Sequence, residues 1–206
     1  SGSNIANVSK NVSSIVSTIG SNFDDMKADK DGITSDLTCD TVLDLRSYES
    51  GTYAVNFDGT SLIDGLLKIY KNDNQRLVIY CTTNSTLALG RFFINGEQST
   101  SYISGQAENL DSAFESIVFV APYATAINMG EVMGTVIAPN ASVGLDGTCG
   151  GVLVAKEVIR TNGEWHYHNH DLPSPTESGA TIGLKAVKNI DGEASTVSGF
   201  SFKLQK

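Results

Sequence analysis

The stretch from Gly134 to His170 constrains the fold of this chain more than any other. It holds three short apolar runs separated by Pro-Asn, Asp-Gly and Gly-Gly dipeptides, at residues 135–138, 143–145 and 152–155. Glycine and asparagine tolerate positive φ, and proline cannot continue a central strand ladder, so the runs are predicted to be strands that end at turns. Their starts lie about nine residues apart, a spacing typical of β-sandwiches and of β-solenoids.

The composition fits a folded domain that is rich in turns. The chain has 206 residues, of which 40% are hydrophobic and 18% charged, and it contains 20 glycines. That length is sufficient to bury a sizeable core. The net charge of −9 disfavours non-specific binding to nucleic acid or to an anionic membrane surface. No apolar run approaches the ~20 residues that span a bilayer, so membrane insertion is not expected either.

Residues 4–28 have a different pattern. Apolar side chains recur there at steps of three and four residues, at Ile5, Val8, Val12, Ile15, Ile19, Phe23 and Met26. This spacing predicts one long amphipathic α-helix. A single helix needs a surface to cover, and the rest of the chain has β-type patterns, so we expect the helix to pack along a β body. An interfacial membrane helix is the weaker alternative, because the polar face carries few Lys or Arg.

Short strands are predicted through the middle of the chain, at residues 41–45, 51–57, 66–70, 76–81, 87–94, 116–120 and 126–128. The Asp-Gly after Phe57 and the Asn-Gly after Ile94 predict tight turns. The run of Asn and Asp at 72–74 predicts a hairpin between residues 68 and 81. Residues 99–115 are polar without a clear period and are predicted to be a long loop or a short helix.

The composition changes again after His170. Residues 172–182 are rich in Pro, Ser, Thr and Gly, which predicts an extended linker. Two alternating strands follow in residues 183–204, joined by a loop that starts at Asp191-Gly192. Because a two-stranded hairpin is marginal alone, this tail is expected to pack on the body, to exchange strands with a neighbouring domain, or to open a second domain.

The segment that starts at Gly134 resembles a known family. Its G-x-x-x-A-P-N-A run, Gly-rich coil and final Gly163-Glu164-x-His166 are similar to the closing part of the choice-of-anchor A domain of bacterial surface adhesins. The resemblance covers approximately residues 5–171 and is strongest over 118–168. It implies one domain over residues 1–171, with a mainly β, β-helix-like body and a helix alongside. It also implies a sortase-anchored surface protein or pilus of a Gram-positive bacterium.

The tail resembles a second family. Its Lys188-x-x-Asp191-Gly192 and the F-x-F-x-L run that ends at Leu204 are similar to the opening of pilin-type isopeptide-linkage domains. The resemblance implies that residues 183–206 are the first strands of a following Ig-like domain. Lys188 would then be the isopeptide lysine, with its asparagine partner on a last strand outside this sequence.

All three histidines of the chain lie in one run, His166-x-His168-x-His170. Alternate residues of a strand share a face, so the three imidazoles are a candidate site for a divalent metal, and no other cofactor is expected. Same-face neighbours lie ~7 Å apart, however, so the strand would have to bend to bring them to one ion. The alternative is a polar strand edge or surface cluster, with Trp165 and Tyr167 on the opposite, inward face.

The three cysteines, Cys39, Cys81 and Cys149, include no C-x-x-C pair. This argues against a zinc ribbon and a thioredoxin-like site. Three buried thiols are favoured, because free cysteine is commonly buried. One disulfide with one leftover thiol, and a Cys-Gln thioester of the kind some adhesins carry, remain the alternatives.

The sequence contains no G-x-S-x-G elbow, P-loop or G-x-G-x-x-G motif, and no regular Thr-x-Thr ranks of the kind found on flat ice-binding faces. This absence of a catalytic motif leads us to expect no enzyme. The two resemblances imply instead an extracellular adhesin domain of the bacterial cell wall, with a host matrix protein or a glycan as its partner. Two alternatives stay open. A carbohydrate-active β-helix enzyme would need carboxylates lined up along one face, and a structural stalk or pilus subunit would bind no ligand.

Overall fold

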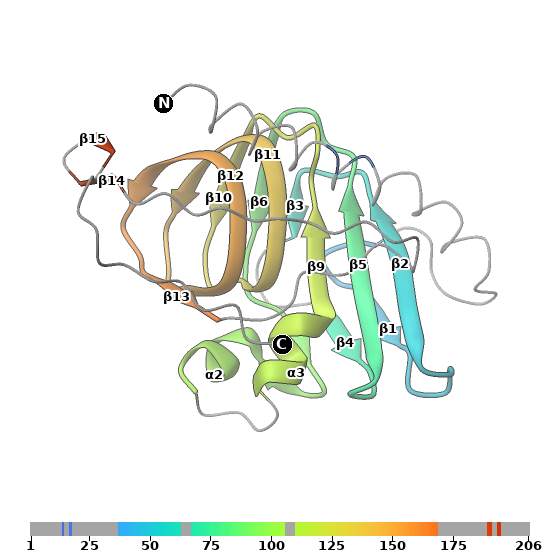
Figure 1. The fold of residues 1–206 in the computed structure, drawn as a ribbon. Helices are drawn as coiled ribbons and strands as arrows, with labels where there is room; N and C mark the ends of the chain where they lie inside the picture. Colours follow the sequence, from blue (N-terminus) through green and yellow to red (C-terminus); the bar gives the residue numbers. More distant parts are fainter. Residues whose placement is uncertain are drawn as a thin grey trace.

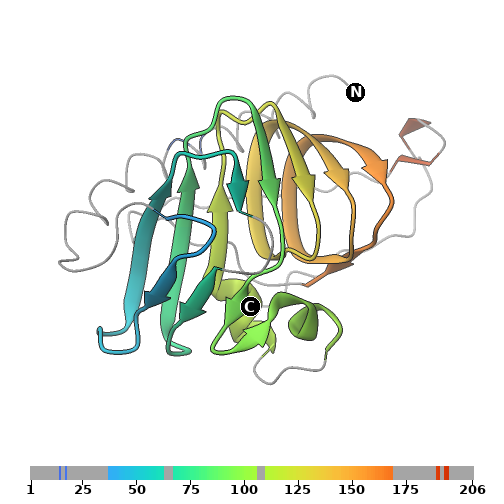
Figure 2. The same ribbon diagram turned by 180° about the vertical axis from the view of Figure 1, so that it is seen from behind.

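The structure is a computed structural model, and it describes residues 37–62, 67–105 and 110–168, together with Ser14, Ser17, 189–190 and 193–194. The described chain is mainly β, with a parallel sheet that curls round in successive coils (Figures 1 and 2). The expected mainly β, β-helix-like fold class is therefore confirmed. No described helix is long and apolar enough to cross a membrane.

Twelve strands build the coils: β1 (Val42–Asp44), β2 (Gly51–Phe57), β3 (Ser61–Leu62), β4 (Lys68–Tyr70), β5 (Gln75–Cys81), β6 (Thr86–Leu89), β7 (Phe93–Ile94), β9 (Ile117–Val120), β10 (Ala126–Met129), β11 (Met133–Leu145), β12 (Cys149–Thr161) and β13 (Trp165–Tyr167). An insertion between β7 and β9 contains β8 (Glu97–Gln98) and the helices α2 (Ser99–Ile103) and α3 (Leu110–Ser116). A separate antiparallel pair, β14 (Asn189–Ile190) and β15 (Glu193–Ala194), lies in the tail.

The coils place their strands in three parallel stacks. The first stack is β1, β4 and β7. The second stack is β2, β5, β9, the first halves of β11 and β12, and then β13. The third stack is β3, β6, β10 and the second halves of β11 and β12. The long strands β11 and β12 thus bend round the corner from the second stack into the third.

The core lies inside the coils and consists of apolar rows in register. In the second stack Val55, Ile79 and Phe119 are partners on neighbouring strands, and all three are buried. Leu87, Ile127 and Val143 form the equivalent row of the third stack, also fully buried. Each coil therefore stabilises the next, since apolar burial contributes roughly 25 cal/mol per Å² and repeats contact mainly their neighbours.

The outer side of the second stack is apolar as well. It carries a separate cluster of Ala54, Val78, Val118, Val120 and Ile137, each at most 4% exposed. A parallel sheet that is buried on both faces has this composition.

The helix predicted over residues 4–28 lies outside the described residues except for Ser14 and Ser17, which are helical and exposed.

Two strand predictions in the first coils were wrong. Residues 68–81 do not form a hairpin, because β4 pairs in parallel with β1 and β7 while β5 pairs in parallel with β2 and β9. Residues 87–94 are two strands, β6 and β7, with a corner between them. Periodicity along one strand shows which side chains are buried, but it contains no information about which strand lies alongside.

The predicted break at Pro139-Asn140 is a bend within β11 rather than the end of a strand. The pairing register with β12 shifts between Ala138 and Ser142, and proline is tolerated at such irregularities. Asn140 donates from Nδ2 to the carbonyl of Pro122 at 2.8 Å, and so joins its coil to the preceding one.

The turn predicted after Ile94 is confirmed. Asn95 and Gly96 have φ of 52° and 92°, and they connect β7 to the antiparallel β8. The predicted strand spacing of about nine residues, in contrast, corresponds to half a coil and not to a full one. Met133 pairs with Gly150 and Gly150 with His166, so one full coil takes 17 and then 16 residues.

The structure describes little of the tail. β14 and β15 pair around Asp191-Gly192, where the joining loop was expected. The linker 172–182, Lys188 and the remainder of 183–206 lie outside the described residues.

Candidate binding surface

The outward side of the third stack is lined by small and polar side chains that recur from coil to coil. Register pairing places them in two rows across the strands: Thr86, Ala126, Ser142 and Glu157 in one, and Ser61, Ala88, Asn128, Gly144 and Arg160 in the other. Residues between them on the same strands, such as Ile127 and Val143, are buried in the core. Alternation along a strand therefore turns both rows toward solvent. We call these nine residues the outer third face.

Arg160 orders one edge of this face. Its Nε donates to Oδ1 of Asp146 at 2.8 Å, and its terminal nitrogen donates to the second carboxylate oxygen and to Oδ1 of Asn128. The guanidinium lies over Gly144, where an added Cβ would meet it at 2.8 Å. The hydrogen bonds from Arg160 lower the pKa of Asp146. Both side chains are almost half exposed, so the pair mainly fixes geometry and adds little stability.

A groove of about 360 Å³ lies where the third stack ends and the chain turns. Its lining comes from equivalent positions on three successive coils: Ala88, Leu89, Gly90, Arg91, Asn128, Met129, Gly130, Glu131, Asp146 and Gly147. A second ion pair, with 3.5 Å between Nε of Arg91 and Oε2 of Glu131, forms part of the wall. The groove adjoins the outer third face and shares Ala88 and Asn128 with it.

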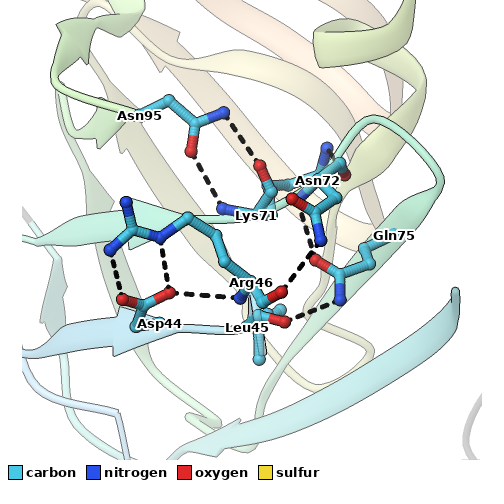
Figure 3. Close-up of polar contacts among 7 residues, drawn as sticks. All are labelled: Asp44, Leu45, Arg46, Lys71, Asn72, Gln75 and Asn95. Carbon is cyan, nitrogen blue, oxygen red and sulfur yellow. Dashed lines mark hydrogen bonds and ion pairs between the residues drawn. The ribbon is translucent and has the colours of Figure 1, made fainter. Parts of the chain in front are cut away.

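The corner between the first and second stacks is polar for a structural reason (Figure 3). Gln75 is 1% exposed, and its Nε2 donates to the carbonyls of Leu45, Tyr48 and Glu49, while its Oε1 accepts from the backbone N–H of Asn72. The carbonyl of Leu45 also accepts from the N–H of Tyr48, and that of Glu49 from the hydroxyl of Tyr53. The buried amide therefore ties three carbonyls of the corner together while its own polar atoms are satisfied. The amide is fully used inside the protein and is not offered to a ligand.

Three further contacts hold the same corner (Figure 3). Asn95 accepts from the N–H of Lys71 and donates to its carbonyl, both at 2.9 Å, which ties two coils together. The Nζ of Lys71 donates to the carbonyl of Asn72, and burial lowers the pKa of this lysine. Arg46 donates two side-chain hydrogen bonds to Asp44 and lowers the pKa of that carboxyl to about 2.

The histidines of the predicted metal site have separate partners where the structure describes them. His166 lies with its Nε2 3.3 Å from Oε2 of Glu164, and the ring of His168 stacks on Phe114 with centroids 3.8 Å apart. His170 lies outside the described residues. Within the described ranges no three metal-ligating side chains gather, so a site that uses all three histidines stays a prediction.

Trp165 was expected to point inward, and it does: it packs against the core and donates from Nε1 to the carbonyl of Gly151 at 3.2 Å. The same expectation for Tyr167 was wrong, because its side chain is 68% exposed. β13 is only three residues long and pairs with β12 at one edge, so nothing among the described strands covers it there.

All three cysteines are free thiols in this structure, and the expectation that all three are buried holds for two of them. Cys81 and Cys149 are buried, whereas Cys39 is partly exposed. Burial raises the pKa of Cys81 to about 12 and also raises that of Cys149. Both thiols therefore stay neutral at physiological pH, as inert core residues do.

A family model described as "Putative Ice-binding-like adhesive domain" matches residues 1–167 of the chain, and the match ends where β13 ends. The chain belongs to this family of adhesive domains. No curated protein and no solved structure matches the chain. The match supports the adhesive character expected from the sequence resemblance.

Proposed function

We propose that this adhesive domain binds a ligand on a biological surface through its outer third face, with no chemical step. One observation carries the proposal. The outward residues Thr86, Asn128 and Arg160 of the third stack are exposed, whereas Val78, Val118 and Ile137, at outward positions of the second stack, are buried. Stacked strands repeat every ~4.8 Å, so the exposed rows present small polar groups on a rigid, regularly spaced surface. Such a surface loses little freedom on binding and suits an extended ligand.

The groove charges favour binding over hydrolysis. A glycoside hydrolase needs one carboxylic acid whose pKa is raised so that it stays protonated near neutral pH. Here Glu131 and Asp146 each face an arginine, and the pKa of Asp146 is lowered. Both carboxylates are suited to accepting hydrogen bonds. This supports the adhesin over the carbohydrate-active enzyme.

The setting we propose is the outside of a bacterial cell, at the cell wall. Membership of an adhesive-domain family supports a surface or extracellular protein in general. The finer assignments come from the resemblances in the sequence: a choice-of-anchor A domain, a following pilin-type domain, and a sortase-anchored protein or pilus of a Gram-positive bacterium. The partner in this proposal is a host matrix protein or a glycan.

We also propose that residues 4–28 form the helix that covers the outer side of the second stack. Val78, Val118 and Ile137 are buried there although they point away from the core. Ser14 and Ser17 are helical and exposed, and the 3.6-residue period places both opposite the apolar stripe of the predicted helix.

Binding to immobilised matrix proteins and to a glycan array tests the adhesive role. The variant Ala126→Trp places a bulky ring in the centre of the outer third face without reaching the core, and it should reduce binding at least tenfold. The matched control is Val42→Trp on the first stack, where the native side chain is 62% exposed, and this variant should bind as the wild type does. Equal binding by both variants would remove the outer third face from the proposal, and a wild type that binds no surface component would remove the adhesive function.

A further inference from the structure

We propose that the groove at the end of the third stack is a subsite for a neutral glycan, which it holds through hydrogen bonds to adjacent sugar hydroxyls. The inference rests on the proposed function, because it names a ligand class for the same surface. Four properties of the groove lead to it: rigid walls, an open floor, balanced charge, and hydrogen-bonding groups that remain usable.

The walls are rigid because stacking of the coils satisfies their backbone. The N–H groups of Gly90, Gly130 and Asp146 donate to carbonyls of the preceding coil at 2.8, 3.0 and 2.7 Å. Glu131 has a φ of 62°, and the fully buried Ser99 donates from Oγ to its carbonyl at 2.7 Å. The side chains at the groove therefore stand on fixed positions, which lowers the entropy cost of holding a ligand.

The floor is open because residue 130 is glycine. A Cβ added at Gly130 would meet no atom within 4 Å, so any side chain there would occupy free space in the groove. The volume of about 360 Å³ falls in the ~300–1,000 Å³ range of small-molecule sites. Because the lining crosses three coils, the groove extends over about 10 Å, which accommodates a short piece of an extended polymer.

The charges within the groove cancel. Arg91 pairs with Glu131 in the lining, and Asp146 pairs with Arg160, which contacts it from beside the groove. With Arg160 counted, no excess charge is left to select an ionic ligand. The chain as a whole carries −9, so a sulfated or otherwise polyanionic glycan would be repelled at long range. A neutral ligand needs no excess charge in the groove, and the net charge of the chain does not repel it.

The remaining hydrogen-bonding capacity matches hydroxyl groups. The Asp146 carboxylate accepts two bonds from Arg160 and one from the side chain of Asn162, which leaves its two oxygens room to accept one more. Asn128 uses Oδ1 for Arg160, and within the described part of the chain its Nδ2 has no acceptor. A hydroxyl both donates and accepts, so two neighbouring hydroxyls of a sugar can donate to Asp146 and accept from Asn128 at the same time.

The test is an array of neutral oligosaccharides built from hexoses and N-acetylhexosamines, printed beside sulfated glycans, with titration calorimetry on the hits. The variant Gly130→Leu fills the groove in free space, and we expect at least a tenfold loss of affinity with an unchanged Tm. Asn128→Asp keeps the acceptor for Arg160 but removes the Nδ2 donor, so it should lose several-fold. Ser85→Leu, at the exposed opposite end of β6, is the matched control and should bind normally.

The outcomes separate the two proposals. If Ala126→Trp abolishes binding while Gly130→Leu and Asn128→Asp bind normally, the outer third face stands as the adhesive surface and the groove is not its glycan subsite. The same conclusion follows if the wild type binds a matrix protein, or sulfated glycans alone, and no neutral glycan. Loss of neutral-glycan binding in both groove variants, with normal binding by Ser85→Leu, supports the subsite. A wild type that binds nothing overturns both.

Discussion

The outer sides of the second and third stacks differ in character although the strands β11 and β12 contribute to both. Val118 and Ile137 point outward from the second stack and are buried, whereas Thr86 and Asn128 point outward from the third stack and are exposed. β11 runs through both stacks, and its outward residues change from apolar to small and polar at the bend after Ala138. In a coiled sheet each side can therefore acquire its own role, one for packing and the other for contact with solvent and ligands.

The sharpest way to break this comparison is to place the same charge on both sides. Val118→Asp should destabilise the protein by about 4 kcal/mol or more, because it buries a carboxylate without a partner. Ala126→Asp, on the third stack, should change stability by at most about 1 kcal/mol, since it is a surface substitution. Urea unfolding measures both. Equal effects would show that the two outer sides are covered to the same degree, contrary to the structure.

The buried polar corner between the first and second stacks allows a second test. Gln75→Leu should cost about 2–3 kcal/mol, because the carbonyl of Tyr48 loses this donor and the N–H of Asn72 loses its acceptor. Gln98→Leu, at a more exposed position in β8, is the matched control and should lie within about 0.5 kcal/mol of the wild type. Denaturant midpoints, converted with one m-value for all variants, give the differences in unfolding free energy. A neutral result for Gln75→Leu would mean that water reaches this corner.

Alkaline pH should weaken the second stack specifically. The pKa of Cys81 is raised from 9.0 to about 12 by burial, so its neutral thiol contributes stability that is complete below pH 9 and is lost as the pH rises toward 12. The loss from this one group is at most about 1.4 kcal/mol per pH unit. The difference in unfolding free energy between the wild type and Cys81→Ala should therefore shrink between pH 8 and pH 10.5. A constant difference over that range would contradict the burial of this thiol.

The smallest effect on stability is expected at the exposed corner of the third stack. Arg160→Ala removes an ion pair whose two side chains are nearly half exposed, so Tm should not change measurably. Ligand binding should nevertheless weaken, because Asp146 and Asn128 lose the group that holds them in place. Thermal unfolding and calorimetry on the same sample separate the two effects. A clear drop in Tm would indicate that this corner is structural, as the Gln75 corner is.

Local signals predicted much of the framework. The strand at 51–57 agrees with β2 at both ends, and the Asn95-Gly96 turn joins β7 to β8 as expected. Both rest on interactions within a few residues, namely alternation of apolar side chains and the tolerance of Asn and Gly for positive φ. The hairpin predicted over 68–81 failed because its two strands look alike whether they pair with each other or with strands from adjacent coils.

The candidate binding surface was missed at the level of sequence. Thr86, Ala126 and Ser142 are unremarkable residues in three separate strands, and only their pairing register aligns them in one row. The usable signal was the alternation of buried Leu87, Ile127 and Val143 with small or polar neighbours. The prominent histidines drew attention instead, although two of them contact Glu164 and Phe114 in the structure.

The sequence by itself determined which side chains enter the core, where the chain turns, and that the adhesive domain is mainly β, because alternation and turn propensity act over a few residues. The tertiary structure alone decided which strands pair in parallel, which outer side is buried, and which three turns meet to form the groove. Those properties depend on residues one coil apart in the chain, from 16 residues between Gly150 and His166 to 40 between Thr86 and Ala126, where the insertion intervenes. Their contacts arise only when successive coils stack in register.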